Sequence, residues 1–181
     1  MNASLTGPSL ALHNLGLAAG FGGSLFGQMA LHPAVRTIDD HKERGQILQK
    51  AWRGFSPANA FAIGAVALTW LTGRAALSGG EIDRRARAMV LAKDALVAAY
   101  AGTGIASIVI GLRRGKREPP MEAGGVPAPE TAEEDARAMK TVNWLGRANI
   151  LAGAGIICLT ALLNIKAGQS GKWNVIARLL P

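Results

Sequence analysis

The first apolar run of the chain constrains its fold more than any other feature. Ser9–Leu31 contains 23 residues and no ionised side chain. As a helix it would measure about 34 Å, which is enough to cross the hydrocarbon core of a bilayer. Gly16, Gly20, Gly23 and Gly27 recur along it at spacings of four, three and four, so they share one helix face, here called the glycine face. A face without side chains lets a neighbouring backbone approach closely, which is how helices associate in lipid.

Three more apolar runs follow, and together they indicate the fold class. They cover Ala58–Leu77, Val90–Leu112 and Leu145–Ile165, and their charged residues lie near the ends. Each is close to the length that a transmembrane helix requires. Of the 181 residues 49% are hydrophobic and 18% are charged, and the apolar residues gather in these runs. We therefore predict an all-α integral membrane protein, a single domain over residues 1–181 that forms a four-helix bundle.

Small residues recur in the third run as well, where Gly102 and Ala106 continue a stripe suited to close packing. The glycine face can pack within one chain or between copies. A four-helix monomer already offers it a neighbour, which favours packing within the chain.

The connections between the spans carry helix signals. Thr37–Asp40 resembles a capping box that opens an amphipathic helix through Arg53, and we expect that helix to lie in the membrane interface. Ser56 and Pro57 are typical of an N-cap and a first-turn proline, so they predict the start of the second span. The tail at 172–180 could form another short amphipathic helix.

The loop before the last span differs in composition. Residues 118–130 are rich in Pro and Gly, and we expect them to be mobile. Thr131–Glu134 then has the spacing of a second capping box, which predicts a helix that runs unbroken into the fourth span.

The two halves of the chain resemble each other. Residues 10–23 align with residues 91–104 at a constant offset of 81, with Leu10/Leu91 and Gly23/Gly104 among the matches. A real duplication would give a 2+2 parallel repeat about an axis along the membrane normal. Ala- and Gly-rich helices also match by chance, so both alternatives stay open.

The formal net charge of +8 comes from basic residues at the span ends rather than from one patch. Arg113, Arg114, Lys116 and Arg117 directly follow the third span, where they are suited to anionic lipid headgroups rather than to nucleic acid. Met1–Pro8 has no positive charge, which argues against a signal peptide and for a permanent first helix. The first and third loops carry more Lys and Arg than the opposite side, so we expect both termini outside a plasma or inner membrane.

Four tryptophans lie near the span ends, as an interfacial aromatic belt requires: Trp52, Trp70, Trp144 and Trp173. The one cysteine, Cys158, lies within the fourth span, where it is best interpreted as a small apolar side chain.

Few residues are candidates for chemistry. His13 and Asn14 in the first span, with Lys93 and Asp94 in the third, could form a polar cluster in which the acid orients the imidazole. Of these, His13 and Asp94 are the catalytic candidates. The alternative, that these are ordinary residues of helix ends, is simpler.

Other polar residues suggest no metal and no cofactor. His32 lies near the opposite membrane face from His13, and His41 lies in a loop helix, so the histidines form no metal motif. Arg147 and Asn149 near the start of the last span could bind a headgroup or join helices by hydrogen bonds. No acidic or basic residue lies near the middle of a span, which disfavours ion pumps and proton-coupled transporters.

His32-Pro33-Ala34 at the end of the first helix, and the Trp144, Arg147 and Asn149 pattern that opens the last, resemble the small four-helix anthrone-oxygenase-like membrane proteins. That resemblance implies cofactor-free oxidation of a lipophilic polycyclic substrate. It supplies no catalytic motif, and His13 is the candidate base on chemical grounds only.

Two hypotheses follow. The first is a non-enzymatic accessory or scaffold subunit that forms a homo-oligomer or joins a larger complex in the bilayer through its small-residue faces. It predicts a bundle without an internal cavity. The second is a membrane enzyme or binder of a lipophilic small molecule. It predicts a cavity of several hundred cubic ångströms between the helices, bordered by His13 or Arg147.

Overall fold

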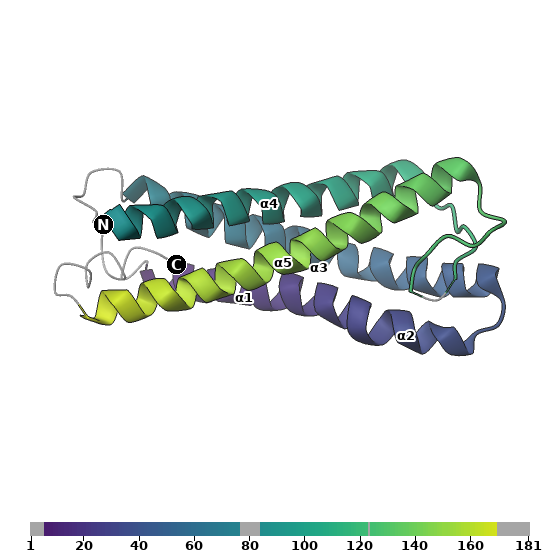
Figure 1. The fold of residues 1–181 in the computed structure, drawn as a ribbon, viewed down its shortest axis with the longest axis horizontal. Coiled ribbons are helices and arrows are strands. Elements are labelled where there is room, and N and C mark those ends of the chain that lie inside the picture. Colours follow the sequence, from purple (N-terminus) through teal and green to yellow (C-terminus); the bar gives the residue numbers. More distant parts are fainter. Residues whose placement is uncertain (1–5, 77–83, 123, 170–181) are drawn as a thin grey trace.

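The computed structural model describes residues 6–76, 84–122 and 124–169, which fold into a bundle of four long helices (Figure 1). The helices are α1 (Thr6–Phe26), α3 (His41–Ala76), α4 (Arg84–Arg114) and α5 (Glu133–Gln169). The prediction of an all-α bundle is confirmed. The tail helix predicted at 172–180, with Trp173, lies outside the described residues.

The helices form two hairpins. α1 packs on α3 and α4 packs on α5, and the hairpins meet where α3 contacts α4 and α1 contacts α5. Both hairpin connections lie at the same end of the bundle, on the right of Figure 1, here called the loop end. Each helix is therefore antiparallel to its neighbours. The arrangement is compatible with a 2+2 bundle, and the duplication itself stays a prediction.

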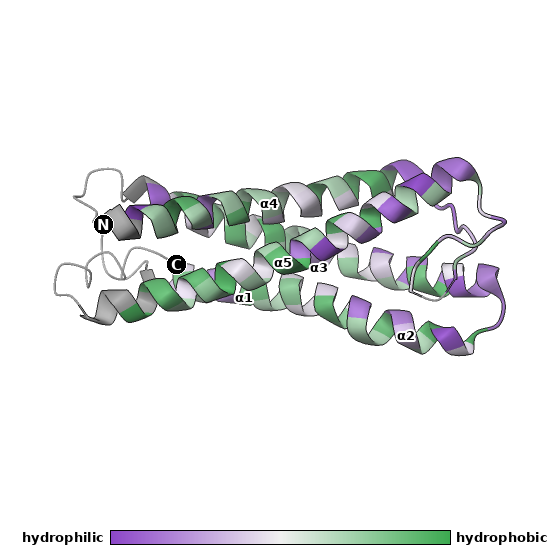
Figure 2. Ribbon diagram, viewed as in Figure 1, coloured by the Kyte–Doolittle hydropathy of each residue, from purple (hydrophilic) through white to green (hydrophobic). Residues whose placement is uncertain are grey.

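Within the described part of the chain, three helices are long and apolar enough to cross a membrane: His41–Arg74, Arg87–Arg114 and Glu133–Leu163. In the most apolar stretch of the second of these, only 17% of the residues are buried inside the bundle. Hydrophobic residues cover the middle of the helices, whereas hydrophilic residues gather at the loop end (Figure 2). So large an exposed apolar surface is unusual for a protein in water and indicates a membrane location.

The first apolar run is divided. α1 ends at Phe26, and the π-helix η1 (Gly27–Leu31) follows, closed by the N–H of His32 donating to the carbonyl of Gly27. The short helices α2 (His32–Ala34) and η2 (Val35–Thr37) complete the turn. Pro33 has no N–H and its ring conflicts with the preceding turn of a regular helix, which accounts for the wider turn.

The glycine face packs within the chain, against α3. A Cβ atom added at Gly23 would lie 2.3 Å from the ring of Phe55, and one added at Gly27 would lie 2.3 Å from the ring of Trp52. Gly16 also lies against α3, whereas Gly20 lies between Ala62 of α3 and the hydroxyl of Tyr100 of α4. Two large aromatic side chains therefore occupy the space that a side chain at Gly23 or Gly27 would fill.

The predicted break between an interfacial helix and the second span is wrong. α3 runs continuously from His41 to Ala76 with Pro57 inside it. Pro57 has no N–H to donate to the preceding turn, and the hydroxyl of Ser56 donates to the carbonyl of Trp52 at 2.9 Å. The amphipathic segment therefore continues the axis of the second span and does not lie separately in the interface.

Both predicted capping boxes are also wrong. The cap of α3 is Asp40, whose Oδ1 accepts a hydrogen bond from the N–H of Glu43 at 2.7 Å, whereas Thr37 belongs to η2. The hydroxyl of Thr131 donates to the carbonyl of Pro120 at 2.7 Å and so fixes the loop rather than the helix. The prediction that α5 continues unbroken into the fourth span is confirmed.

The described part of the Pro/Gly-rich loop has specific contacts. The N–H of Met121 donates to the carbonyl of His41 at 2.9 Å. The side chain of Met121 is buried in a small hydrophobic cluster with Val35, Leu48 and Met139. These contacts argue against the mobility that the composition predicts.

Candidate functional site

A cavity of about 490 Å³ lies between the helices near the loop end. It is lined from the stretches 48–59 of α3, 104–114 of α4 and 139–150 of α5, together with Ser24, Gln28, His32, Gly115, Met121 and Gly125. Every long helix therefore contributes to its wall. We call it the loop-end cavity.

The wall combines two kinds of side chain. Its apolar members include Phe55, Ile108 and Ile150, and its polar members include Gln49 and Asn143. The cavity is therefore bordered by both apolar and polar side chains of the bundle. A wall of this composition is typical of a site for a small molecule that is mostly apolar with a few polar groups.

Glycines keep part of this space open. Gly111 lines the cavity, and a Cβ atom added there would have no other atom within 4 Å. Gly146 also lines it, and the nearest atom to an added Cβ is Nε2 of Gln28 at 3.7 Å. Side chains at these positions would enter the cavity without first displacing a neighbour.

Three side chains of the wall have a buried polar atom without a hydrogen-bond partner among the described residues. These atoms are Oδ1 of Asn59, Oδ1 of Asn143 and Nη2 of Arg114. Buried polar groups in folded proteins are normally paired. Their occurrence together around one cavity therefore points to polar groups of a ligand or of water within it.

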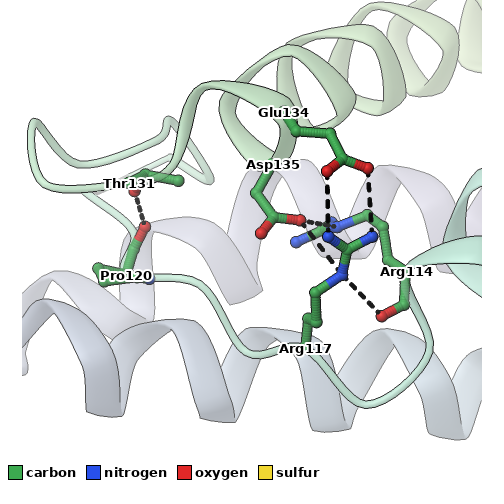
Figure 3. Close-up of polar contacts among 6 residues, drawn as sticks. All are labelled: Arg114, Arg117, Pro120, Thr131, Glu134 and Asp135. Atoms are coloured by element: carbon green, nitrogen blue, oxygen red, sulfur yellow. Dashed lines mark hydrogen bonds and ion pairs between the residues drawn. The ribbon is translucent and has the colours of Figure 1, made fainter.

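Arg114 is the most buried cation of the wall, with 8% of its side chain exposed. Its Nε lies 3.4 Å from Oδ1 of Asp135, and Nε of Arg117 lies 3.8 Å from the same oxygen (Figure 3). Arg117 also contacts Glu134 at 3.5 Å. This network joins the end of α4 to the first turn of α5.

His32 lines the cavity beside Trp52, and their rings meet edge to face at 6.0 Å between centroids. Burial, and then the charge of Arg147, lower the pKa of His32 below its ordinary value of 6.5. The imidazole is therefore neutral at neutral pH. The loop closes over it at Gly125, which has a positive φ of 72° and where an added Cβ would lie 3.1 Å from the ring.

The predicted polar cluster lies away from the loop-end cavity. His13 is fully buried and its Nδ1 is 2.9 Å from the hydroxyl of Thr69. Lys93 is also fully buried, with Nζ 4.3 Å from the centre of the Trp70 ring.

Asp94 accepts hydrogen bonds from Trp70 at 2.7 Å and from Arg74 at 3.1 Å. Asn14 does not belong to this cluster, because it lines a separate hollow of about 330 Å³ with residues of α5. The cluster thus joins α1, α3 and α4, with Arg74 and Asp94 half-buried. Thr69 and Arg74 are members that the sequence analysis missed, and Trp70 was expected in the aromatic belt instead.

Other predicted residues are distributed as follows. Asn149 is buried and donates to the carbonyl of Tyr100 at 2.8 Å, which joins α4 to α5. Arg147 and Gly102 are exposed, and nothing lies within 4 Å of an added Cβ at Gly102. Ala106 is half-buried and Cys158 is exposed.

The basic group after the third span is divided: Arg114 is buried, whereas Arg113, Lys116 and Arg117 are exposed. The prediction that Trp70 belongs to an interfacial aromatic belt is wrong, because this side chain is only 2% exposed. Trp144, by contrast, is 66% exposed. Among the described residues, no group of three or more His, Cys, Asp or Glu could hold a metal ion.

No protein-family model matches this chain, and a search found no significant match among curated proteins or solved structures. The anthrone-oxygenase-like resemblance therefore stays a prediction.

Proposed function

We propose that this chain is a four-span membrane protein that binds a lipophilic small molecule in the loop-end cavity. The single observation that carries the proposal is the cavity itself, about 490 Å³ between the four helices. Small-molecule sites generally have roughly 300–1,000 Å³ and mostly apolar walls with a few polar groups. α1 is the fourth span, since it packs along α3 over the depth of the apolar helices.

The cavity favours binding over the scaffold hypothesis in two ways. A scaffold was expected to have no internal cavity. The glycine face, one of the small-residue faces through which a scaffold could assemble, is already occupied by Phe55 and Trp52 of the same chain. The border of the cavity differs from the expected one, because His32 and Arg114 line it in place of His13 and Arg147. If the bound molecule is also oxidised, as the resemblance implies, the imidazole beside it is that of His32.

A scaffold role keeps one specific observation in its favour. Ala95, Ala98, Ala99 and Gly102 are exposed along α4, so a small-residue face remains open to a second chain. Assembly through this face is compatible with ligand binding inside the bundle.

Native mass spectrometry of the protein, extracted gently from its own membrane, tests the proposal. We expect one lipophile for each chain, released on activation. Gly111→Leu fills the cavity from α4 without a clash at Cβ, so it should remove the bound mass. Gly102→Leu makes the same change on the outer face of the same helix and should retain it.

Two results would contradict the proposal: wild-type protein that carries no small molecule, or equal retention in the Gly111→Leu variant. A lower oligomeric state in Gly102→Leu would instead support assembly through α4.

A further inference from the structure

We infer that the molecule held in the loop-end cavity is an amphiphile with an acidic group, and that the guanidinium of Arg114 binds this group. The inference rests on the proposed function and names the chemical class of its ligand. It depends on Arg114, on the charges around the cavity and on the shape of the cavity.

Arg114 has a buried donor to offer. A guanidinium presents five N–H donors in a fixed plane. Nε of Arg114 is used by Asp135 at 3.4 Å, whereas Nη2 is buried and has no hydrogen-bond partner among the described residues. A buried charged donor without an acceptor is unfavourable, and an anionic oxygen is the acceptor that satisfies it best.

The charges of the wall are of one sign. Among the described residues, its charged side chains are Arg53 and Arg114, and none of the residues that line it is acidic. Asp135 lies outside the wall, and its Oδ1 is shared between Arg114 and Arg117. Arg53 is 41% exposed and pairs with Glu118 at 3.7 Å, so Arg114 is the cation that water screens least. Arg114 therefore offers a charged and unused donor to a wall whose described residues include no carboxylate, and such a donor favours a negative group of the ligand.

The rest of the cavity is suited to a single apolar chain or a compact ring system. It extends along α4 from Arg114 back to Gly104, ten residues and about 15 Å of helix. Ile108 and Ile150 line this part. We therefore expect a single-chain or compact amphiphile.

Dodecanoate and dodecan-1-ol are matched probes, since they share a chain length and differ in charge. Each is titrated into the purified full-length protein in detergent at alkaline pH, and one-to-one binding is counted by native mass spectrometry. A charge-assisted hydrogen bond corresponds to about ten- to hundredfold in affinity. We therefore expect the wild type to prefer dodecanoate by at least about tenfold.

The Arg114→Gln/Asp135→Asn double variant removes the cation without leaving its acid unpaired, and it should lose this preference. Arg114→Lys keeps a positive charge beside Asp135 but lacks the guanidinium plane. This variant provides a second measurement if the double variant does not fold. In Arg114→Lys the preference for dodecanoate over dodecan-1-ol should fall at least severalfold. Arg113→Gln, at the exposed neighbouring residue, should keep the wild-type preference.

Equal affinity for the acid and the alcohol in the wild type would overturn the acidic-ligand inference, and so would an unchanged preference in both Arg114 variants. Either result would leave the proposed cavity function standing. That function fails separately if neither probe binds, or if both bind Gly111→Leu as well as they bind the wild type.

Discussion

At the scale of single residues, Arg44 holds the loop end together without a carboxylate. Its guanidinium is buried and donates to the carbonyls of Val35 at 3.2 Å, Met121 at 3.3 Å and Ile38. These carbonyls belong to both hairpin connections. In Arg44→Gln each of the three carbonyl groups would lose its charged donor. We therefore expect this variant to lower the free energy of unfolding by about 2–4 kcal/mol. Thermal unfolding in detergent measures this, and Arg36→Gln at an exposed position is the control. Equal melting temperatures for the two variants would contradict the role of Arg44.

His32 makes a second residue-scale prediction, on pH. Its folded-state pKa lies below 6.5 because of burial and the charge of Arg147. As pH falls through about 6.5, the unfolded chain gains a proton that the folded chain does not take up, so stability decreases. We expect the melting temperature to fall between about pH 7.5 and about pH 5.5, and the fall to be smaller in His32→Gln. The pKa of Glu130 is also lowered from its ordinary value of 4.5, by its own backbone N–H and then by His41. This shift changes stability only near and below pH 4.5, outside the range in which His32 acts. An identical pH dependence in wild type and variant would refute the role of His32.

At the scale of helices, adjacent glycines of α1 provide a matched comparison. A Cβ at Gly23 would lie 2.3 Å from the Phe55 ring, whereas a Cβ at Gly22 would have no other atom within 4 Å. Gly23→Ala should therefore destabilise the protein by about 1–3 kcal/mol through overpacking. Gly22→Ala should be neutral or stabilise it by up to about 1 kcal/mol, since alanine favours a helix. Melting temperatures of the two variants compare them directly, and the reverse order would show that α1 does not pack on α3 in this register.

The same helices show what sequence alone can predict. The spacing of the glycine face is local information, so its close packing could be predicted before its partner was known. The continuation of α3 through Pro57 could not, because a proline ordinarily ends or kinks a helix, and the π-turn after Phe26 was missed although Pro33 marks it locally. The cavity was missed for a different reason. Arg114, Asn59 and Asn143 lie far apart in sequence, and only the bundle brings them to one wall.

For the molecule as a whole, the number of spans decides the topology. In the two-hairpin bundle both connections lie at the loop end, while α1 begins and α5 ends at the other end (Figure 1). If α1 crosses the membrane with the other three helices, its start and the connection after α4 lie on opposite sides. Cysteine labelling in a Cys158→Ser background tests this with Gly7→Cys and Lys116→Cys, both at exposed positions. An impermeant thiol reagent added to intact cells should reach only one of them. The loop end carries more Lys and Arg, so we expect the reagent to reach Gly7→Cys. Labelling of both sites from the same side would show that α1 does not span the bilayer, and it would place the loop-end cavity in a three-span protein.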